Sequence, residues 1–225
     1  MNNLNHIAFI MDGNGRWGLK KKKNRNFGHF AGVQTVKKIV ESAIQLKVPI
    51  ITFYVFSTEN WKRPKSEINY LFNLIKIYFN KEINNIIKNK IKIVISGKQQ
   101  NLPLNIKKIL KEATVKTKKN KKLTINLAIN YGSKTELIDA IKKVNYNSQK
   151  ISEENINKNL YSNLLFPDIL VRTGGQKRLS NFMLWQLAYT EIFFLDKLWP
   201  DFTGRDLKKI ISKYHNIKRN FGGIW

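Results

Sequence analysis

The spacing of the apolar runs constrains the fold of this chain more than any other feature. Most of these runs are continuous rather than alternating in polarity, which is typical of strands buried on both faces of a parallel sheet. Six runs predict β-strands, at Ile7–Met11, Ile50–Phe56, Ile91–Ser96, Leu123–Ile129, Ile169–Val171 and Ile192–Leu195.

Helical patterns lie between these runs. They cover about Phe30–Leu46, Lys65–Lys88, Asn105–Lys118, Lys134–Val144, Glu153–Asn163 and Arg205–His215. Strands that alternate with helices favour an open sheet with helices on both sides. We therefore predict an α/β fold, in which residues 1–225 form a single domain with a central, mostly parallel six-stranded sheet flanked by helices.

Composition limits the class of protein. With 225 residues, of which 42% are hydrophobic, the chain can bury a core. No apolar run approaches the ~18 residues of a membrane span, and the first strand begins too early for a signal peptide to precede it. The chain has no cysteine, which excludes disulfides. We expect a cytoplasmic protein.

The chain is strongly basic, with 41 Lys and Arg against 15 Asp and Glu and a formal charge of +26. Such a field attracts nucleic acid, anionic lipid or polyanionic substrates. The lysines are spread along the chain with Asn and Ile, as AT-rich codon usage would produce, so the fewer arginines are more informative. A nucleic-acid-binding protein is the alternative from composition, but no helix-turn-helix, zinc-finger or RNP pattern occurs, and we expect no nucleic-acid partner.

The predicted helix Lys65–Lys88 carries a long apolar face. Pro64 suits the start of this helix. Its apolar residues recur at helical spacing, which is typical of an ordinary core helix. The alternative is that part of the face lines a cavity for an apolar ligand.

Three polar motifs follow predicted strands. They are DGNGRW at Asp12–Trp17, STENWKRP at Ser57–Pro64 and RTGGQKRLSN at Arg172–Asn181. In open parallel sheets, ligands bind at the carboxyl ends of the strands. We therefore expect the three motifs to converge on one site.

The first motif also contains the pattern G-x-G-x-x-G, at Gly13, Gly15 and Gly18, which is typical of dinucleotide-binding sites. In such sites the glycines open a helix, whereas Leu19–Asn26 is a polar run without an apolar face. The second predicted strand also lacks the acid that would bind a ribose. We therefore disfavour a dinucleotide site.

Asp12 is better explained by a divalent metal ion. A carboxylate would repel a diphosphate unless a metal bridged the two, and Mg²⁺ suits this role because it takes few protein carboxylates. Arg16 and Arg25 can bind phosphate oxygens bidentately, and His29 lies near the start of a helix, where free N–H groups bind anions. The motif predicts a magnesium-assisted diphosphate site.

The other two motifs supply further anion-binding groups. Ser57 and Thr58 can donate hydrogen bonds and Arg63 can hold a phosphate, while Trp61 either packs on an apolar tail or anchors the loop. The third motif combines two arginines, a serine and a glycine turn, and no Walker A sequence occurs in the chain. Two anion sites beside an apolar helix predict a protein that joins two apolar diphosphates.

At these residues the chain resembles the cis-prenyltransferases, in particular the bacterial undecaprenyl diphosphate synthases. The matching segments are HIAFIMDGNGRW, RNFGHFAG, FSTENWKRP, ILVRTGGQKRLSNFMLWQ, YTEIFF, WPDF and NFGG. The resemblance implies a homodimer with a hydrophobic tunnel beside the sheet. It also implies sequential condensation of isopentenyl diphosphate onto an allylic diphosphate, typically farnesyl diphosphate. The expected product is a long-chain polyprenyl diphosphate such as undecaprenyl diphosphate, which is the lipid carrier precursor for cell-wall polysaccharide. This lipophilic product makes peripheral contact with an anionic membrane an expectation.

The resemblance also implies roles for single residues. Asp12 matches an essential aspartate that works with magnesium, and Glu191 matches a second metal-binding acid near the dimer interface. Asn60 matches the position named as proton acceptor; because an amide is a poor base, we expect it to orient groups instead. The allylic diphosphate would contact Gly13, Asn14, Gly15, Arg16, Trp17, Arg25 and His29; the second loop would contribute Ser57, Thr58, Glu59, Trp61 and Arg63; and the isopentenyl site would contain Arg172, Arg178, Leu179 and Ser180.

Two departures and two alternatives accompany the resemblance. Gln176 and Lys177 replace the commoner Glu-His pair; we expect this replacement to alter metal or phosphate contacts there without abolishing binding. The segment before the first strand is short. A non-catalytic partner subunit is one alternative, although such subunits usually lack the acid and arginines present here. A synthase with a shorter product is the other, because product length depends on bulk along the tunnel.

Overall fold

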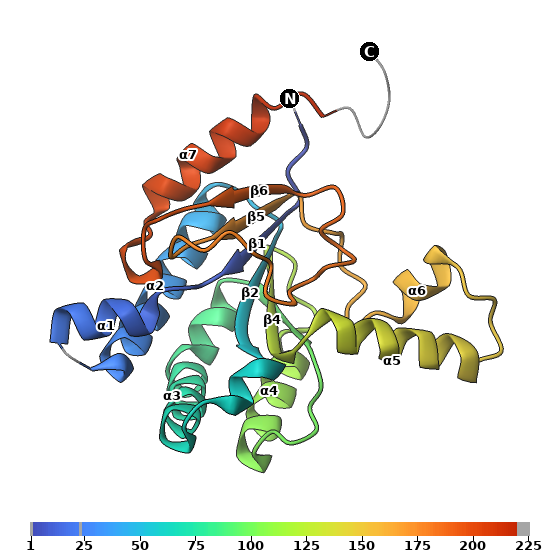
Figure 1. The fold of residues 1–225 in the computed structure, drawn as a ribbon, viewed down its shortest axis with the longest axis horizontal. Helices are drawn as coiled ribbons and strands as arrows, with labels where there is room; N and C mark the ends of the chain where they lie inside the picture. The colour runs from blue at the N-terminus through green and yellow to red at the C-terminus, as the bar shows by residue number, and fades with distance from the viewer. Residues whose placement is uncertain (1, 23, 220–225) are drawn as a thin grey trace. The chain divides into compact units, whose positions relative to one another are not determined.

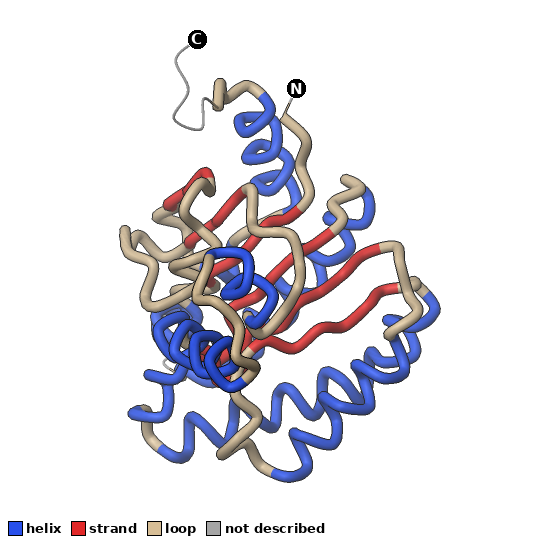
Figure 2. The backbone as a smooth tube through the Cα atoms, turned by 90° about the vertical axis from the view of Figure 1, so that its right-hand side faces the viewer, coloured by secondary structure: helices blue, strands red, loops and turns tan. Residues whose placement is uncertain are grey.

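The structure is a computed structural model that describes residues 2–22 and 24–219. Six strands form one sheet in the order β3-β4-β2-β1-β5-β6. The pairs β1–β5, β5–β6 and β3–β4 are parallel, which confirms the predicted α/β class (Figures 1 and 2). The strands are β1 (His6–Ile10), β2 (Ile50–Ser57), β3 (Ile91–Ser96), β4 (Leu123–Tyr131), β5 (Ile169–Arg172) and β6 (Glu191–Phe194).

The helices follow the predicted order, with one addition at the N-terminus. They are α1 (Asn14–Lys22), α2 (Arg25–Gln45), α3 (Lys65–Lys88), α4 (Leu104–Thr117), α5 (Ser133–Tyr146), α6 (Glu153–Asn159) and α7 (Gly204–His215). Two 3₁₀ helices, η1 (Thr58–Lys62) and η2 (Trp199–Asp201), were not expected from the sequence. None of the helices that the structure describes is both long and apolar enough to cross a bilayer.

The chain divides into two compact units. Unit 1 comprises Met1–Ile51, Phe166–Lys177 and Gln186–Trp225; unit 2 comprises Thr52–Leu165 and Arg178–Trp185. Unit 1 contains β1, β5 and β6 with α1, α2 and α7, and unit 2 contains β3 and β4 with α3 to α6. That residues 1–225 act as one catalytic domain stays a prediction.

The core of unit 1 forms around β1. All five β1 residues are buried, and Phe9 contacts Trp199 and Phe202 edge-to-face, with ring centroids 5.8 and 6.1 Å apart. The indole N–H of Trp199 donates to the Gly32 carbonyl at 2.9 Å, which fixes η2 against α2. This packing holds the carboxyl end of β1, where Asp12 lies.

The helix α1 corrects the expectation that Leu19–Asn26 is not helical. It begins at Asn14, inside the glycine motif, and packs against α2. Its contact needs no apolar face, because the backbones meet directly: a Cβ on Gly28 would lie 1.8 Å from the Asn14 carbonyl oxygen, and one on Gly18 would lie 2.3 Å from that of Asn24. The motif glycine Gly18 therefore serves close helix packing.

The core of unit 2 forms between α3, α4 and β3. In α3, Ile68, Phe72 and Phe79 are buried, whereas Leu71 and Ile75 are half-buried. The apolar face of α3 is thus partly buried in the core, and its half-buried residues leave some apolar surface exposed next to the buried part. The tunnel along this helix stays a prediction.

Candidate active site

Strand register places a carboxylate beside a buried guanidinium in unit 1. Ile10, at the end of β1, pairs with Arg172, at the end of β5, and Asp12 follows Ile10 by two residues. One Asp12 carboxylate oxygen accepts from Arg172 Nη2 at 3.0 Å and the other accepts from Arg16 Nη2 at 3.2 Å. The Arg172 side chain is 4% exposed, so its charge is buried and is partnered by Asp12.

Neighbouring backbone groups hold this cluster in place. The Asp12 carbonyl accepts from the Thr173 hydroxyl at 2.8 Å and from the Trp199 amide at 3.0 Å. Arg16 Nη2 also donates to the Gly174 carbonyl at 2.7 Å. Thr173 was missed in the sequence, where its only signal is its place directly after Arg172.

The cluster fits a magnesium–diphosphate complex. Mg²⁺ is usually bound through one or two carboxylates and completes its shell with water and phosphate oxygens. Asp12 can supply that carboxylate, while Arg16 and Arg172 can bind the phosphate oxygens. Among residues 2–22 and 24–219, no group of three or more His, Cys, Asp and Glu residues could hold a metal by itself.

The other residues expected to bind the allylic diphosphate lie around the same turn. Gly13 (φ +107°) lies against Leu198, and the Arg25 guanidinium lies over Gly15, where a Cβ would be 2.7 Å from Arg25 Cζ. The structure therefore brings this part of the predicted site together within unit 1. Asn14 packs its amide against Gly32, Trp17 donates to Asp201 at 2.8 Å and stacks on Phe27, and His29 is 8% exposed in α2.

Glu191 lies at the opposite end of the strands from Asp12. The register aligns Glu191 with Ile169, and Ile169 with Ile7, which precedes Asp12 by five positions. At about 3.3 Å per residue, the three steps from Ile7 to Ile10 span about 10 Å, and the chain turns at Asp12, so Glu191 and Asp12 lie about 10 Å or more apart along the strands. Within one chain the structure does not bring the two expected metal ligands together, and the metal-binding role of Glu191 stays a prediction.

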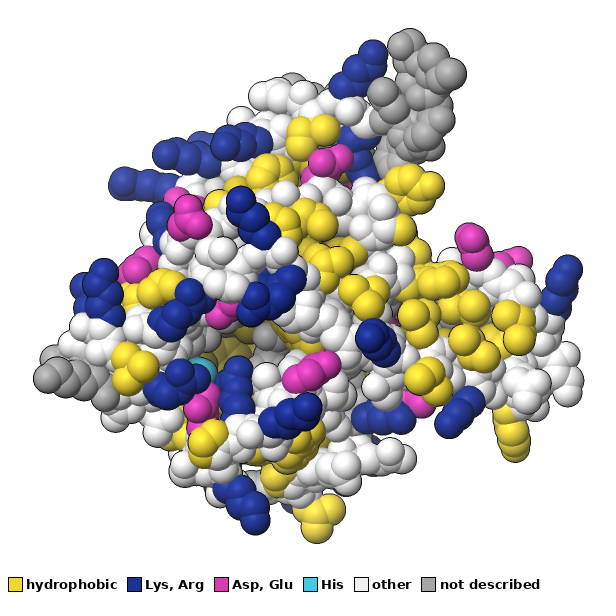
Figure 3. Space-filling model, viewed as in Figure 1, with side chains coloured by type: hydrophobic (Ala, Val, Ile, Leu, Met, Phe, Trp, Pro, Cys, Tyr) yellow, Lys and Arg dark blue, Asp and Glu magenta, His cyan; other side chains and the backbone are white. Residues whose placement is uncertain are grey.

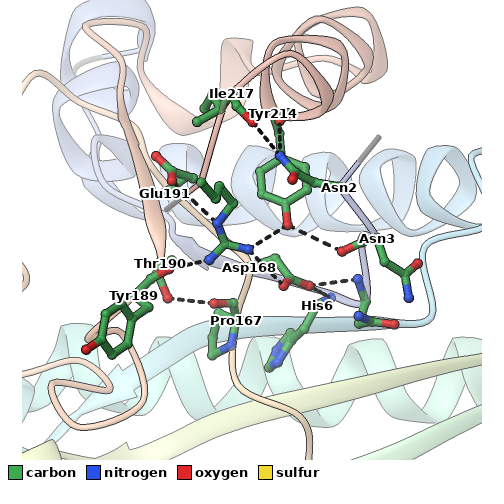
Figure 4. Close-up of polar contacts among 12 residues, drawn as sticks. Asn2, Asn3, His6, Pro167, Asp168, Tyr189, Thr190, Glu191, Tyr214 and Ile217 are labelled. Atoms are coloured by element: carbon green, nitrogen blue, oxygen red, sulfur yellow. Dashed lines mark hydrogen bonds and ion pairs between the residues drawn. The ribbon is translucent and has the colours of Figure 1, made fainter. Parts of the chain in front are cut away.

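A polar cluster that includes Asp168 and Tyr214 lies around Glu191 (Figure 4), and Arg219 interacts with all three of these residues. Its guanidinium lies 3.6 Å from Glu191 Oε1 and 3.7 Å from Asp168 Oδ1, and it donates to the Tyr214 hydroxyl at 2.9 Å. Asp168 also accepts from the His6 amide at 3.0 Å. The cluster thus joins β1, β5 and β6 to the end of α7.

In unit 2, the loop after β2 is held by its own side chains. Asn60 Oδ1 accepts from the Ser57 amide at 3.2 Å, so this oxygen shapes the loop. Arg63 donates to Glu67 at 3.1 Å, and Glu67 is 8% exposed. Glu67 was missed, although its spacing of four from Arg63 is a helical ion-pair signal.

Trp61 anchors this loop. Its indole N–H donates to Asn130 Oδ1 at 2.8 Å, and its ring packs on Phe56 and Phe72. The Asn130 amide nitrogen donates to the carbonyls of Lys98 and Gln100. Of the two readings of Trp61, the structure shows the anchor; contact with an apolar tail stays a prediction.

The segment Arg178–Trp185 packs on the same unit. Arg178 and Ser180 are exposed and Leu179 is half-buried. Tyr54 stacks on Phe182 with centroids 4.4 Å apart, and its hydroxyl donates to the Ser180 carbonyl at 3.3 Å. The residues expected to bind isopentenyl diphosphate are thus divided, since Arg172 belongs to unit 1 and the other three belong to unit 2.

Glu59 and Thr58 lie beside this segment. Glu59 accepts from Asn181 Nδ2 at 2.8 Å and from the Thr58 hydroxyl at 3.2 Å. Partial burial raises the pKa of the Glu59 carboxyl, but hydrogen bonds from Asn181, its own backbone, Ser57 and Thr58 outweigh burial, and the pKa lies below its usual value. Glu59 is therefore ionised at neutral pH.

The parallel α/β sheet and a carboxylate between two arginines at the carboxyl ends of its strands are typical of proteins that bind diphosphates with a divalent metal, and comparison with known proteins specifies the class. Residues 10–222 match the family model Prenyltransf, described as "Putative undecaprenyl diphosphate synthase". The chain belongs to this family and is a cis-prenyltransferase, which confirms the resemblance seen in the sequence.

Three relatives illustrate the match. The chain is 44% identical over 237 residues to the ditrans,polycis-undecaprenyl-diphosphate synthase ((2E,6E)-farnesyl-diphosphate specific) of Micrococcus luteus, covering 99% of this chain and 95% of the relative. A crystal structure titled a probable undecaprenyl diphosphate synthase from Campylobacter jejuni superposes with a TM-score of 0.86 at 36% identity, covering 99% and 100% of the two chains. Lavandulyl diphosphate synthase from Lavandula x intermedia, in complex with dimethylallyl diphosphate, superposes with a TM-score of 0.92 at 30% identity, covering 97% and 98%.

Proposed function

We propose that this cis-prenyltransferase condenses isopentenyl diphosphate repeatedly onto farnesyl diphosphate and releases undecaprenyl diphosphate. The observation that carries the proposal is the Asp12 carboxylate held between Arg16 and Arg172 at the carboxyl edge of the sheet. The Micrococcus luteus relative, whose name specifies this primer and this product, supports the substrate assignment. The product would serve as the lipid carrier precursor for cell-wall polysaccharide.

The residues of the site suit the chemistry of this condensation. Arg16 binds the primer diphosphate and stabilises the negative charge that builds on it as the allylic C–O bond breaks, while Arg172 binds the diphosphate of isopentenyl diphosphate. Magnesium, when bound through Asp12, supplies further charge neutralisation of the diphosphates. The alkene of isopentenyl diphosphate attacks the allylic carbon, a C–C bond forms, and a proton is lost from the resulting cation.

Asn60 would orient the reacting groups during this step. Its Oδ1 already accepts a hydrogen bond from the Ser57 backbone amide. The side-chain nitrogen of Asn60 can therefore donate to a substrate oxygen. An amide has no pKa near neutral pH at which it could accept the proton. We therefore assign the proton to a diphosphate oxygen or a water.

The test is incubation with farnesyl diphosphate, labelled isopentenyl diphosphate and magnesium, with chromatography of the products. The wild type should give a long polyprenyl product, and Asp12→Ala should lose it by at least about a hundredfold. Glu153→Ala, which removes an exposed acid of α6, is the control and should retain full activity. A folded wild type that incorporates no label would reject the proposal and favour a non-catalytic subunit.

A synthase with a shorter product is the second candidate. The superposition on lavandulyl diphosphate synthase shows that this fold also serves a protein whose product is named as a different prenyl diphosphate. The length of the labelled product decides between the two candidates.

We propose that the enzyme is a homodimer that uses the exposed apolar face of α5. Ile138 is 53% exposed and Ile141 is 40% exposed, and with their spacing of three they share one side of the helix. Apolar side chains gather over α5 and α6 (Figure 3). Sedimentation should show a dimer that Ile138→Glu dissociates, whereas Lys143→Glu, on another side of α5, should leave it intact.

We also propose that the basic surface brings the cytoplasmic enzyme to anionic membranes. Lysine and arginine side chains are spread over the visible face (Figure 3). Each cation near an anionic surface contributes about 1 kcal/mol of attraction. Cosedimentation should be stronger with anionic than with neutral vesicles, and equal binding to both would reject this proposal.

A further inference from the structure

Asn181 connects the two loops of unit 2 that are expected to hold substrate. It directly follows Ser180 in the segment Arg178–Trp185, and its Nδ2 donates to Glu59 Oε1, next to Asn60, at 2.8 Å. The two loops come from distant parts of the sequence. The side chain of Asn181 therefore links the Asn60 loop directly to the Ser180 segment.

Asn181 is itself held on three sides. Its Oδ1 accepts from the Lys134 amide at 2.9 Å, and its carbonyl accepts from the Ser133 amide at 2.8 Å. Its backbone has a φ of +61°, in the left-handed region that asparagine tolerates better than most residues. Both the backbone and the side chain of Asn181 are thus fixed to the start of α5.

Close packing at Gly132 reinforces the connection. A Cβ on Gly132 would lie 2.6 Å from Thr58 Oγ1 and 2.7 Å from Asn181 Nδ2. The residue before α5 must therefore lack a side chain for Thr58 and Asn181 to approach each other. Thr58 also donates to Glu59 at 3.2 Å, so this contact continues the same set of hydrogen bonds.

We infer that Asn181 is a positioning residue for the condensation, which sets the distance between the Asn60 loop and the Arg178–Ser180 segment through its hydrogen bond to Glu59. The inference rests on the proposed function. Misplacing one substrate by a fraction of an ångström lowers turnover strongly, because the reacting carbons must be aligned. The residue is half-buried at the surface, so its loss should affect turnover more than folding.

Removing the hydrogen-bond donor at this position tests the inference. Asn181→Asp still accepts from the Lys134 amide but places a carboxylate against Glu59. We expect kcat/KM for isopentenyl diphosphate to fall at least about tenfold, with an unchanged thermal midpoint. Asn84→Asp, which adds the same charge on the exposed side of α3, is the matched control and should change little.

The double variant Asn181→Asp with Glu59→Gln supplies the rescue by reversing the polarity of the hydrogen bond. In this variant the new amide at position 59 can donate to the new carboxylate at position 181. Its activity should therefore return to within about threefold of that of Glu59→Gln alone. An Asn181→Asp variant equal to Asn84→Asp, or a double variant whose loss is the product of the two single losses, would overturn the inference.

Hydrogen exchange separates failure of this inference from failure of the proposed function. Peptides spanning residues 57–63 should exchange faster in Asn181→Asp and at the wild-type rate in the double variant, whether or not the wild type is active. Unchanged exchange in Asn181→Asp would also overturn the inference.

Discussion

At the scale of single residues, glycines set how closely α1 approaches α2. Gly28 has its Cα against the start of α1, where a Cβ would lie 1.8 Å from the Asn14 carbonyl oxygen. Backbone atoms cannot yield to such a contact without moving the helix. Because α1 carries Arg16 and Trp17, the distance between α1 and α2 directly affects the geometry of the Asp12 cluster.

We therefore predict that Gly28→Ala displaces α1 and lowers prenyl transfer at least about tenfold, with a loss of stability of about 2 kcal/mol. Lys38→Ala, at an exposed position of the same helix, should leave both quantities unchanged. Product assays and urea unfolding measure them. Wild-type activity in Gly28→Ala would show that the position of α1 is not critical.

Asn130 acts in a similar way on the second loop. It accepts from Trp61 and adopts a φ of +50°, so alanine would lose the hydrogen bond and strain the backbone. We predict that Asn130→Ala lowers kcat/KM about tenfold, since it frees Trp61. Asn101→Ala, which has a φ of +66° without the tryptophan contact, controls for backbone strain and should be nearly silent in the kinetic assay.

Charged site residues are easier to identify from the sequence than the neutral residues that hold the site in place. Asp12, Arg16 and Arg172 could be selected because acids and arginines after strands have a direct chemical use. Thr173, Asn130 and Asn181 could not be selected, because a neutral side chain shows its role only through a contact that is distant in sequence.

At the scale of elements, most boundaries agree with the sequence within a few residues, and α3 agrees at both ends. Apolar periodicity predicts the strands and the long helices, because burial of part of each element requires apolar residues at regular positions. It misses α1, which packs through glycine backbone, and η1, whose end is set by local hydrogen bonds.

The last helix illustrates an element fixed by its cap. Thr203 and Asp206 form a capping box at the start of α7, and Asp206 also accepts from Lys197 at 2.8 Å. Partial burial raises the pKa of Asp206, but hydrogen bonds from Lys197 and Thr203 and the charge of Lys197 outweigh it and lower the pKa overall. A lowered pKa means that this stabilisation is present above the unfolded pKa of about 4 and is lost as the pH falls through the folded value.

We predict that Asp206→Asn costs about 1 kcal/mol at pH 7, and that the difference from wild type narrows progressively as the pH falls below about 4. Ser212→Ala, at an exposed position of the same helix, should leave stability unchanged at both pH values. Urea unfolding at pH 7 and at about pH 3 measures this. A difference that persists at the lower pH would show that ionisation of Asp206 is not its source.

At the scale of the whole molecule, the α/β class and the strand order along the chain follow from the sequence, but the register does not. Motif matching assigns both Asp12 and Glu191 to metal binding. The register places them about 10 Å or more apart along the strands of unit 1, because Glu191 begins β6 whereas Asp12 follows the end of β1. Short apolar strands pair in several registers with similar burial, so only the folded chain decides.

This separation leads to a prediction about the proposed homodimer. If both acids serve one metal site, Glu191 must come from the second copy. A mixed dimer of Asp12→Ala and Glu191→Gln chains would then contain one intact site, formed by the Asp12 of the Glu191→Gln chain and the glutamate of the other chain. Each parent homodimer would contain none.

We expect mixing the two inactive variants under subunit exchange to restore activity, approaching about one quarter of the wild-type value when equal amounts recombine at random. Mixing Asp12→Ala with Asp12→Asn chains is the control and should restore nothing. An unrestored mixture that sedimentation shows to contain mixed dimers would place Glu191 outside the metal site.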